Sequence, residues 1–124
     1  MKEIIHKELS YMLVGIFYKV HDQLGQYARE KQYGDLLEKL LKEKGISYKR
    51  EALISKTGDD INKADFIVDN SIVIELKVKP GVNREDYYQV KRYLEMSNLL
   101  LGMIVNFRQN YLKPKRVINS KYSS

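Results

Sequence analysis

The sequence predicts an α/β (α+β) fold in which a mixed β-sheet is flanked by helices. Two segments near the N-terminus carry apolar residues at helical spacings of three and four, and three short strand-like segments follow them. A third amphipathic helix then precedes a continuous apolar run. A strand, a crossover helix and a second strand imply one parallel pair, so the expected order is ααβββαβ with a short additional strand at the end.

The pattern places each element in turn. Helical periodicity defines three helices, at residues 3–24, 29–44 and 84–97. Gly25 and Gly45 follow the first two and are expected to end them. Strand-like composition defines five strands, at residues 46–54, 64–68, 72–78, 99–107 and 115–119. Residues 55–62 are rich in Gly and Asp and are expected to form a turn.

The length and composition exclude several classes of protein. A chain of 124 residues is enough for one domain with one core, so residues 1–124 are expected to form a single domain. The absence of cysteine excludes disulfide scaffolds, thiolate zinc sites and cysteine nucleophiles, and it fits a cytoplasmic protein. No apolar run approaches the roughly 20 residues of a membrane span, and the N-terminus lacks a signal-peptide pattern, so no membrane partner is expected.

The charge balance favours a polyanionic partner. The chain has 22 Lys and Arg residues against 16 Asp and Glu residues, which gives a net charge of +6. Nucleic acid is the expected partner, although many basic proteins bind no polyanion and the charge alone does not decide. Tyr87 and Tyr88 on the third helix are candidates for contact with nucleic acid.

Two of the expected strands form a hairpin whose register is determined by their apolar residues. One register puts both apolar faces on the same side of the sheet, and it pairs Val68 with Ile72 and Phe66 with Ile74. This register places Ala64 on the same face as Phe66. It leaves residues 69–71 as the loop, in which Asn70 suits a left-handed backbone conformation.

The same register places Asp65 directly opposite Glu75. Two adjacent carboxylates repel each other by about 0.2–1 kcal/mol, so a nearby cation is expected. Lys77 on the same face, with Lys63 opposite it, suits a salt-bridge cluster. The carboxylates equally suit a metal ion, and such oxygen ligands favour Mg²⁺, Mn²⁺ or Ca²⁺ over zinc. Charge alternation is also common on half-exposed strands, and the spacing alone favours that solvated arrangement.

The helices carry two further polar pairs. Gln89 and Tyr93 are four residues apart on the third helix and therefore lie on one face. Glu30 lies in the first turn of the second helix, where a negative charge is favourable. Tyr33, one turn further on, is expected in the core.

Together these residues resemble a known nuclease signature. Asp65, the run Glu75-Leu76-Lys77 and the pair Gln89 and Tyr93 resemble the PD-(D/E)xK motif with the Q-x-x-x-Y helix of its exonuclease-like branch. Nearly the whole chain is similar to the small GxxExxY proteins of bacteria. The matching segments are residues 20–25, 30–33, 44–46, 73–77 and 102–107.

Two positions depart from the GxxExxY pattern. Tyr27 replaces the glycine that opens the motif, so the turn into the second helix is expected to differ in shape or to narrow the mouth of the site. Lys63 and Ala64 precede Asp65, where the family has a proline. Every candidate catalytic residue type is nevertheless present.

The resemblance implies a restriction-endonuclease-like fold and hydrolysis of phosphodiester bonds in nucleic acid, expected to be DNA. It implies that Asp65, Glu75 and Glu30 bind Mg²⁺ or Mn²⁺, with Glu30 acting directly or through water. The backbone carbonyl of Leu76 would assist them.

It also implies roles for the remaining motif residues. Lys77 would orient or deprotonate the attacking water and stabilise the charged transition state. Gln89 would position Lys77 or the phosphate, and Tyr93 would pack behind it or contact the nucleic acid backbone.

Two other functions stay open. The first is a structure-selective, junction-type nuclease that acts as a homodimer. The first helix, with Met12, Ile16, Phe17 and Val20, could supply an apolar dimer face, although core packing explains these residues equally well. The second is a non-catalytic nucleic-acid-binding module that retains the fold.

Overall fold

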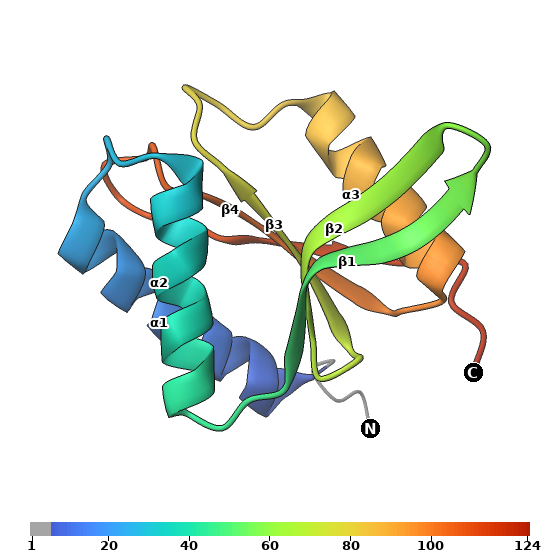
Figure 1. Ribbon diagram of the computed structural model, residues 1–124, viewed down its shortest axis with the longest axis horizontal. Helices are drawn as coiled ribbons and strands as arrows, with labels where there is room; N and C mark the ends of the chain where they lie inside the picture. The colour runs from blue at the N-terminus through green and yellow to red at the C-terminus, as the bar shows by residue number, and fades with distance from the viewer. Residues whose placement is uncertain (1–5) are drawn as a thin grey trace.

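Within residues 6–124, the part of the chain that the computed structural model describes, a five-stranded mixed sheet separates two helices from a third (Figure 1). The elements are α1 (Lys7–Leu24), α2 (Glu30–Glu43), β1 (Tyr48–Thr57), β2 (Asp60–Val68), β3 (Ile72–Lys77), α3 (Arg84–Ser97), β4 (Leu101–Asn106) and β5 (Lys115–Ile118). The predicted mixed α+β architecture and order are confirmed, including the short last strand. Residues 3–5 of the first expected helix lie outside the described residues.

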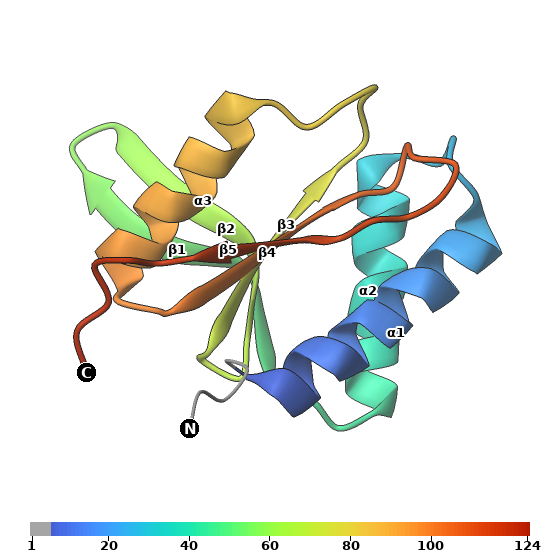
Figure 2. The ribbon, with the colours of Figure 1, turned by 180° about the vertical axis from the view of Figure 1, so that it is seen from behind.

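The sheet order follows the chain, β1-β2-β3-β4-β5. Strands β3 and β4 are parallel and joined through α3, as predicted, and the other neighbours are antiparallel. Figure 2 shows α1 and α2 on one face of the sheet and α3 on the other. Because both faces are covered, β4 is buried along its whole length and β3 along all but its last residue.

Two hydrophobic clusters fill the spaces on either side of the sheet. The cluster under α1 and α2 contains Phe17 and Tyr33 from the helices together with Phe66 and Ile74 from the strands. The cluster under α3 is smaller and includes Val90. None of the helices in residues 6–124 is long and apolar enough to cross a membrane.

The central hairpin has the predicted register but departs from simple alternation at one point. Val68 pairs with Ile72 and Phe66 with Ile74, as predicted. Ala64, however, packs in the α3 cluster, whereas Phe66 packs on the opposite side, so the expectation of a shared face is wrong. The reason is a bend in β1 and β2, visible in Figure 1, where Glu51 adopts a left-handed conformation with φ 49°.

The outer part of the same sheet is longer than the sequence indicates. Residues 55–62, expected to form a turn, instead continue β1 and β2 to the tight turn around Gly58, whose φ is 60°. This part of the hairpin is largely exposed, so its side chains are polar and lack the apolar alternation by which a strand is recognised in a sequence. The loop after β2 uses two left-handed residues, Asp69 and the expected Asn70.

We expect Gly102→Ala to lower the free energy of unfolding by about 1–3 kcal/mol through overpacking. A Cβ at Gly102 would lie 2.5 Å from Cγ1 of Val90 and 3.4 Å from Cδ1 of Leu94, where α3 crosses β4. Urea denaturation measures the change. The matched control is Gly15→Ala on the exposed side of α1, where a Cβ meets no atom within 4 Å and should stabilise the helix by about 0.5–1 kcal/mol. Equal stability of both variants would contradict this account of the α3 packing.

Candidate active site

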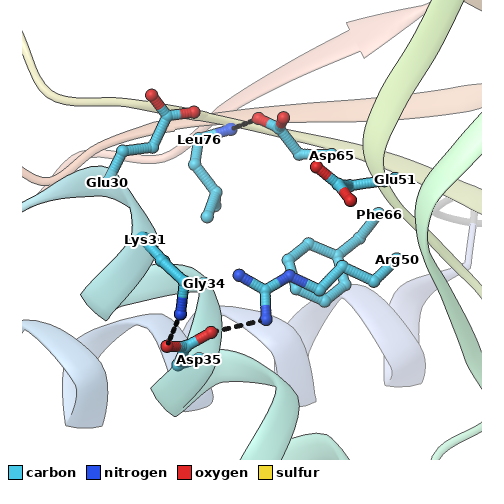
Figure 3. Close-up of a pocket in the computed structure, with 9 residues that line it drawn as sticks. All are labelled: Glu30, Lys31, Gly34, Asp35, Arg50, Glu51, Asp65, Phe66 and Leu76. Carbon is cyan, nitrogen blue, oxygen red and sulfur yellow. Dashed lines mark hydrogen bonds and ion pairs between the residues drawn. The ribbon is translucent and has the colours of Figure 1, made fainter.

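A cleft of about 540 Å³ opens between the first turns of α2 and the bend of β1 and β2. Figure 3 shows its lining, in which polar side chains of α2 and β1 face the carboxylate of Asp65. Strands β2 and β3 reach the edge of this cleft where their backbone pairing ends, at Phe66 and Ile74. The cleft therefore lies where the hairpin carries its acidic residues.

Asp65 and Glu75 lie side by side at the end of the β2–β3 ladder, where the sequence register places them. The backbone ladder stops at Phe66 and Ile74. Beyond it, the Asp65 N–H donates to Oε1 of Glu75 at 3.1 Å. The Leu76 N–H donates to Oδ2 of Asp65 at 2.8 Å (Figure 3). Side-chain oxygens thus replace the missing backbone acceptors and hold both carboxylates in fixed positions.

Burial and repulsion make the ionised form of this pair unfavourable. Glu75 is only 4% exposed. Its burial, together with the neighbouring charge of Asp65, raises the pKa of Glu75 to about 8, and Lys77 only partly opposes this. Two carboxylates in this arrangement must share either a proton or a cation.

Lys77, Gln89 and Tyr93 form a chain of hydrogen bonds beside the carboxylates. Nζ of Lys77 donates to Oε1 of Gln89 at 3.0 Å, and Nε2 of Gln89 donates to the Tyr93 hydroxyl at 3.2 Å. Burial and the negative charge of Glu75 raise the pKa of Tyr93, so its hydroxyl keeps its proton. The structure therefore brings together five of the predicted residues, two from β3, two from α3 and one from β2.

Sequence reasoning missed Asp86, which also contacts Lys77. Its Oδ1 lies 3.6 Å from Nζ of Lys77, and its Oδ2 pairs with Nζ of Lys79. Asp86 is fixed by a reciprocal capping box with Asn83 at the start of α3. The pattern Asn83-x-x-Asp86 is a helix-start signature, so the box itself could have been found from sequence.

A buried asparagine fixes the chain that leaves β3. Nδ2 of Asn106 donates to the Lys79 carbonyl at 2.7 Å, and its Oδ1 accepts from the Lys79 N–H at 3.2 Å. Asn106 is the last residue of β4, which runs beside β3. This clamp holds the segment that carries Lys77 and Lys79 against the sheet.

Glu30 reaches the cleft from the first turn of α2. Burial first, and then the charge of Asp65, raise the pKa of Glu30, while Lys77 opposes them. Glu30 is thus close enough to feel both groups. Within residues 6–124, however, no three His, Asp or Glu side chains form a group that could hold a metal ion, so the structure does not gather Glu30 with Asp65 and Glu75 in this way.

Tyr33 positions the turn from which Glu30 projects. Its ring is fully buried and stacks on Phe107 with ring centroids 4.4 Å apart. Its hydroxyl donates to the Gly25 carbonyl and accepts from the Ala28 N–H, at 3.2 Å. The tyrosine therefore ties the loop between α1 and α2 to the core.

Tyr27, which replaces the expected glycine, points away from the core. It is exposed, and the guanidinium of Arg108 lies 5.6 Å from the centre of its ring. Gln26 and Arg108 also exchange hydrogen bonds with each other's backbone carbonyls. The substitution therefore changes the outer surface of the turn, which stays anchored to the loop after β4.

The donor set of the site fits a hard divalent cation. Each backbone hydrogen bond occupies one oxygen of Asp65 or Glu75 and leaves the second oxygen to share a proton or a cation with the neighbouring carboxylate. Lys77 is already engaged by Gln89 and Asp86 and does not neutralise the pair. Carboxylate oxygens in this arrangement suit Mg²⁺, Mn²⁺ or Ca²⁺.

Comparison with known proteins supports this chemistry. Residues 7–118 match the family model of the PD-(D/E)XK nuclease superfamily. Members of that superfamily are generally nucleases that use divalent metal ions, which implies a nucleic acid substrate. No curated protein and no solved structure matches the chain significantly.

We expect Tyr33→Phe to loosen the turn before α2 while leaving the stacking on Phe107 in place. Removing the hydroxyl leaves Ala28 N–H and the Gly25 carbonyl without their partner and should cost about 1 kcal/mol of stability. Hydrogen exchange at the Ala28 amide should accelerate. Tyr111→Phe, at an exposed tyrosine, is the control and should change neither quantity. Unchanged exchange at Ala28 in Tyr33→Phe would show that the hydroxyl does not hold the turn.

We expect Glu75→Gln to stabilise the metal-free protein, and to do so more as the pH rises. The pKa of Glu75 is raised from 4.5 to about 8 in the folded protein. Between these two pH values the folded protein keeps a proton that the unfolded chain loses, so the stability of the wild type falls as the pH rises. Glutamine has no such proton and can still accept from the Asp65 N–H.

Urea denaturation in the presence of a chelator, at about pH 5 and about pH 8, measures this effect. The stability gain of Glu75→Gln should be greater at the higher pH by about 1 kcal/mol or more. Glu43→Gln, an exposed carboxylate at the far end of α2, should show no pH-dependent difference. A constant gain for Glu75→Gln at both pH values would mean that Glu75 ionises normally in the folded protein.

Proposed function

The chain belongs to the PD-(D/E)XK nuclease superfamily, and on that premise we propose that it uses Mg²⁺ or Mn²⁺ to hydrolyse phosphodiester bonds of DNA. The observation that carries the proposal is the braced pair of Asp65 and Glu75 with Lys77 beside it. The overall charge of +6 supports a polyanionic substrate. The sequence motifs further support a place among the GxxExxY proteins within this superfamily.

Asp65 and Glu75 would hold the metal ion, and the Leu76 carbonyl would assist them. Glu30, which reaches the cleft from α2, would be the third ligand, directly or through a water molecule. The metal ion supplies Lewis-acid polarisation of the phosphate and lowers the pKa of water. Its charge would also balance that of the two carboxylates, whose burial and mutual repulsion raise the pKa of Glu75.

Lys77 orients the attacking water and stabilises the negative charge that develops on the phosphate. Gln89 accepts a hydrogen bond from the Lys77 ammonium group and donates one to the Tyr93 hydroxyl, which keeps Gln89 in place. Asp86 holds the same ammonium group from the other side. Lys77 therefore approaches the carboxylates in one orientation, which is what positional catalysis requires.

The homodimeric alternative lacks the surface that the sequence offered for it. Of the four apolar residues of α1 named for a dimer face, Ile16, Phe17 and Val20 are buried in the core and Met12 alone is exposed. Core packing thus accounts for most of that face. The non-catalytic alternative is distinguished from the nuclease by the experiment below.

We expect metal-dependent cleavage of labelled DNA by the wild-type protein and a loss of about 100-fold or more in Glu75→Gln and in Lys77→Ala. Single-stranded and duplex DNA, with matching RNA, should be incubated with Mg²⁺, with Mn²⁺ and with a chelator. Glu43→Gln removes a remote exposed carboxylate and should cleave as the wild type does.

Titration calorimetry of Mg²⁺ and Mn²⁺ on the same proteins locates the site. Binding by the wild type and its loss in Glu75→Gln supports the proposed ligands. The absence of both DNA cleavage and metal binding at millimolar concentration would refute the nuclease function and favour a binding module.

A further inference from the structure

Arg50 of β1 projects into the same cleft and belongs to none of the motifs that identified the site. Its guanidinium lies 5.6 Å from the centre of the Phe66 ring. Figure 3 shows it between that ring and α2, on the side of the cleft away from Asp65. Its side chain is 27% exposed, so Arg50 is half-buried at the edge of the cleft.

Two carboxylates of α2 fix the guanidinium by one of its ends. Nη1 of Arg50 donates to Oδ1 of Asp35 at 2.7 Å and to Oε1 of Glu38 at 3.1 Å. Nη1 carries two hydrogens, and these two bonds use both of them. The orientation of Arg50 is therefore set by α2, the helix that also carries Glu30.

The remaining donors of Arg50 are unused. Nε and Nη2 carry three hydrogens, and neither nitrogen makes a hydrogen bond to any residue in the described range 6–124. Figure 3 shows one guanidinium nitrogen directed into the open cleft toward Leu76. A fork of N–H groups in this position matches two oxygens of one phosphate group.

A glycine makes room for this arrangement. A Cβ at Gly34 would lie 2.6 Å from Nη2 and 3.2 Å from Cζ of Arg50. Any side chain at position 34 would push the guanidinium out of place. The absence of a side chain on α2 is thus required for Arg50 to lie in the cleft.

We propose that the Nε–Nη2 edge of Arg50 binds a phosphate group of the nucleic acid strand next to the bond that is cleaved. The proposal rests on the proposed nuclease function, since it concerns the substrate of that site. The phosphate is either a phosphodiester within the strand or a monoester at its end, because both present two oxygens to the fork.

The charges of the cleft make this binding depend on a divalent cation. Four carboxylates, Glu30, Asp35, Glu51 and Asp65, line the cleft against only two basic groups, Lys31 and Arg50. A phosphate therefore enters against a net negative charge unless a divalent cation is bound as well. Arg50 would then orient the phosphate through its two N–H groups, and the cation would offset the negative charge of the cleft.

The test is the binding of a fluorescein-labelled 12-nucleotide DNA, followed by anisotropy in the presence of Ca²⁺, which takes the same oxygen ligands. Arg50→Lys keeps the charge but loses the fork, and Gly34→Ala keeps the arginine but displaces it. Both should bind the DNA about tenfold or more weakly than the wild type. Lys121→Gln removes an exposed positive charge beside Glu95, remote from the cleft, and should stay within about twofold.

Oligonucleotides with and without a 5′-phosphate identify the source of the phosphate. A preference for the 5′-phosphate that both variants lose assigns a strand end, and equal weakening for both oligonucleotides assigns an internal phosphodiester. Wild-type affinity in both Arg50→Lys and Gly34→Ala would overturn the proposal.

A measurement on the unmodified protein covers the case in which a variant does not fold. The Nε–H resonance of Arg50 should shift in the NMR spectrum when the same DNA and Ca²⁺ are added together. The absence of a shift at saturating DNA would overturn the proposal. If the variants bind DNA weakly and the wild type does not cleave it, the phosphate-binding role of Arg50 stands and the nuclease function is rejected. If the wild type cleaves DNA and both variants cleave it with an unchanged KM, the nuclease function stands and the role of Arg50 is rejected.

Discussion

The structure of the site depends on two hydrogen bonds that continue the β2–β3 hairpin after its backbone ladder ends. They join the carboxylates of Asp65 and Glu75 to the backbone of the opposite strand. A bend at Glu51 makes them necessary, because it turns β2 away from β3 and leaves backbone N–H groups without ladder partners. The same two bonds bring like charges together, so a structural requirement and a chemical one are met by the same atoms.

The cost of holding two carboxylates together is offset by the packing around them. β3 and β4 are buried on both faces, and α3 packs so closely on β4 that no side chain would fit at Gly102. This close packing lies in the parallel pair of β3 and β4 next to the site. A rigid scaffold allows an acidic pair that is costly in itself to persist.

The sequence predicted the hairpin register correctly because a shift by one residue would turn charged side chains of one strand toward the apolar face of the other and bury a charge. It could not predict the position of Ala64, because the bend at Glu51 comes from a backbone conformation that the composition of β1 does not signal. The prediction of a turn at residues 55–62 was wrong for a related reason: an exposed hairpin needs no apolar alternation.

Arg50 illustrates what sequence patterns do not reveal about the site. Its partners Asp35 and Glu38 lie on a different element, and its place depends on an absent Cβ at Gly34. The signature residues lie on β2, β3 and α3, with Glu30 alone on α2, so the motifs do not point to Arg50 on β1. One wall of the cleft is formed by α2 and β1, and only the folded chain brings it together with the other.

The charge distribution explains how a basic protein can have an acidic cleft. The chain carries a net charge of +6, yet the cleft is lined by four carboxylates and two basic groups, so the positive surplus lies elsewhere. Under the proposed function, the outer surface attracts the nucleic acid without regard to sequence, and the cleft itself repels a phosphate until a cation is bound. Binding of the strand and entry of one phosphate are then separate events, and the divalent ion controls the second.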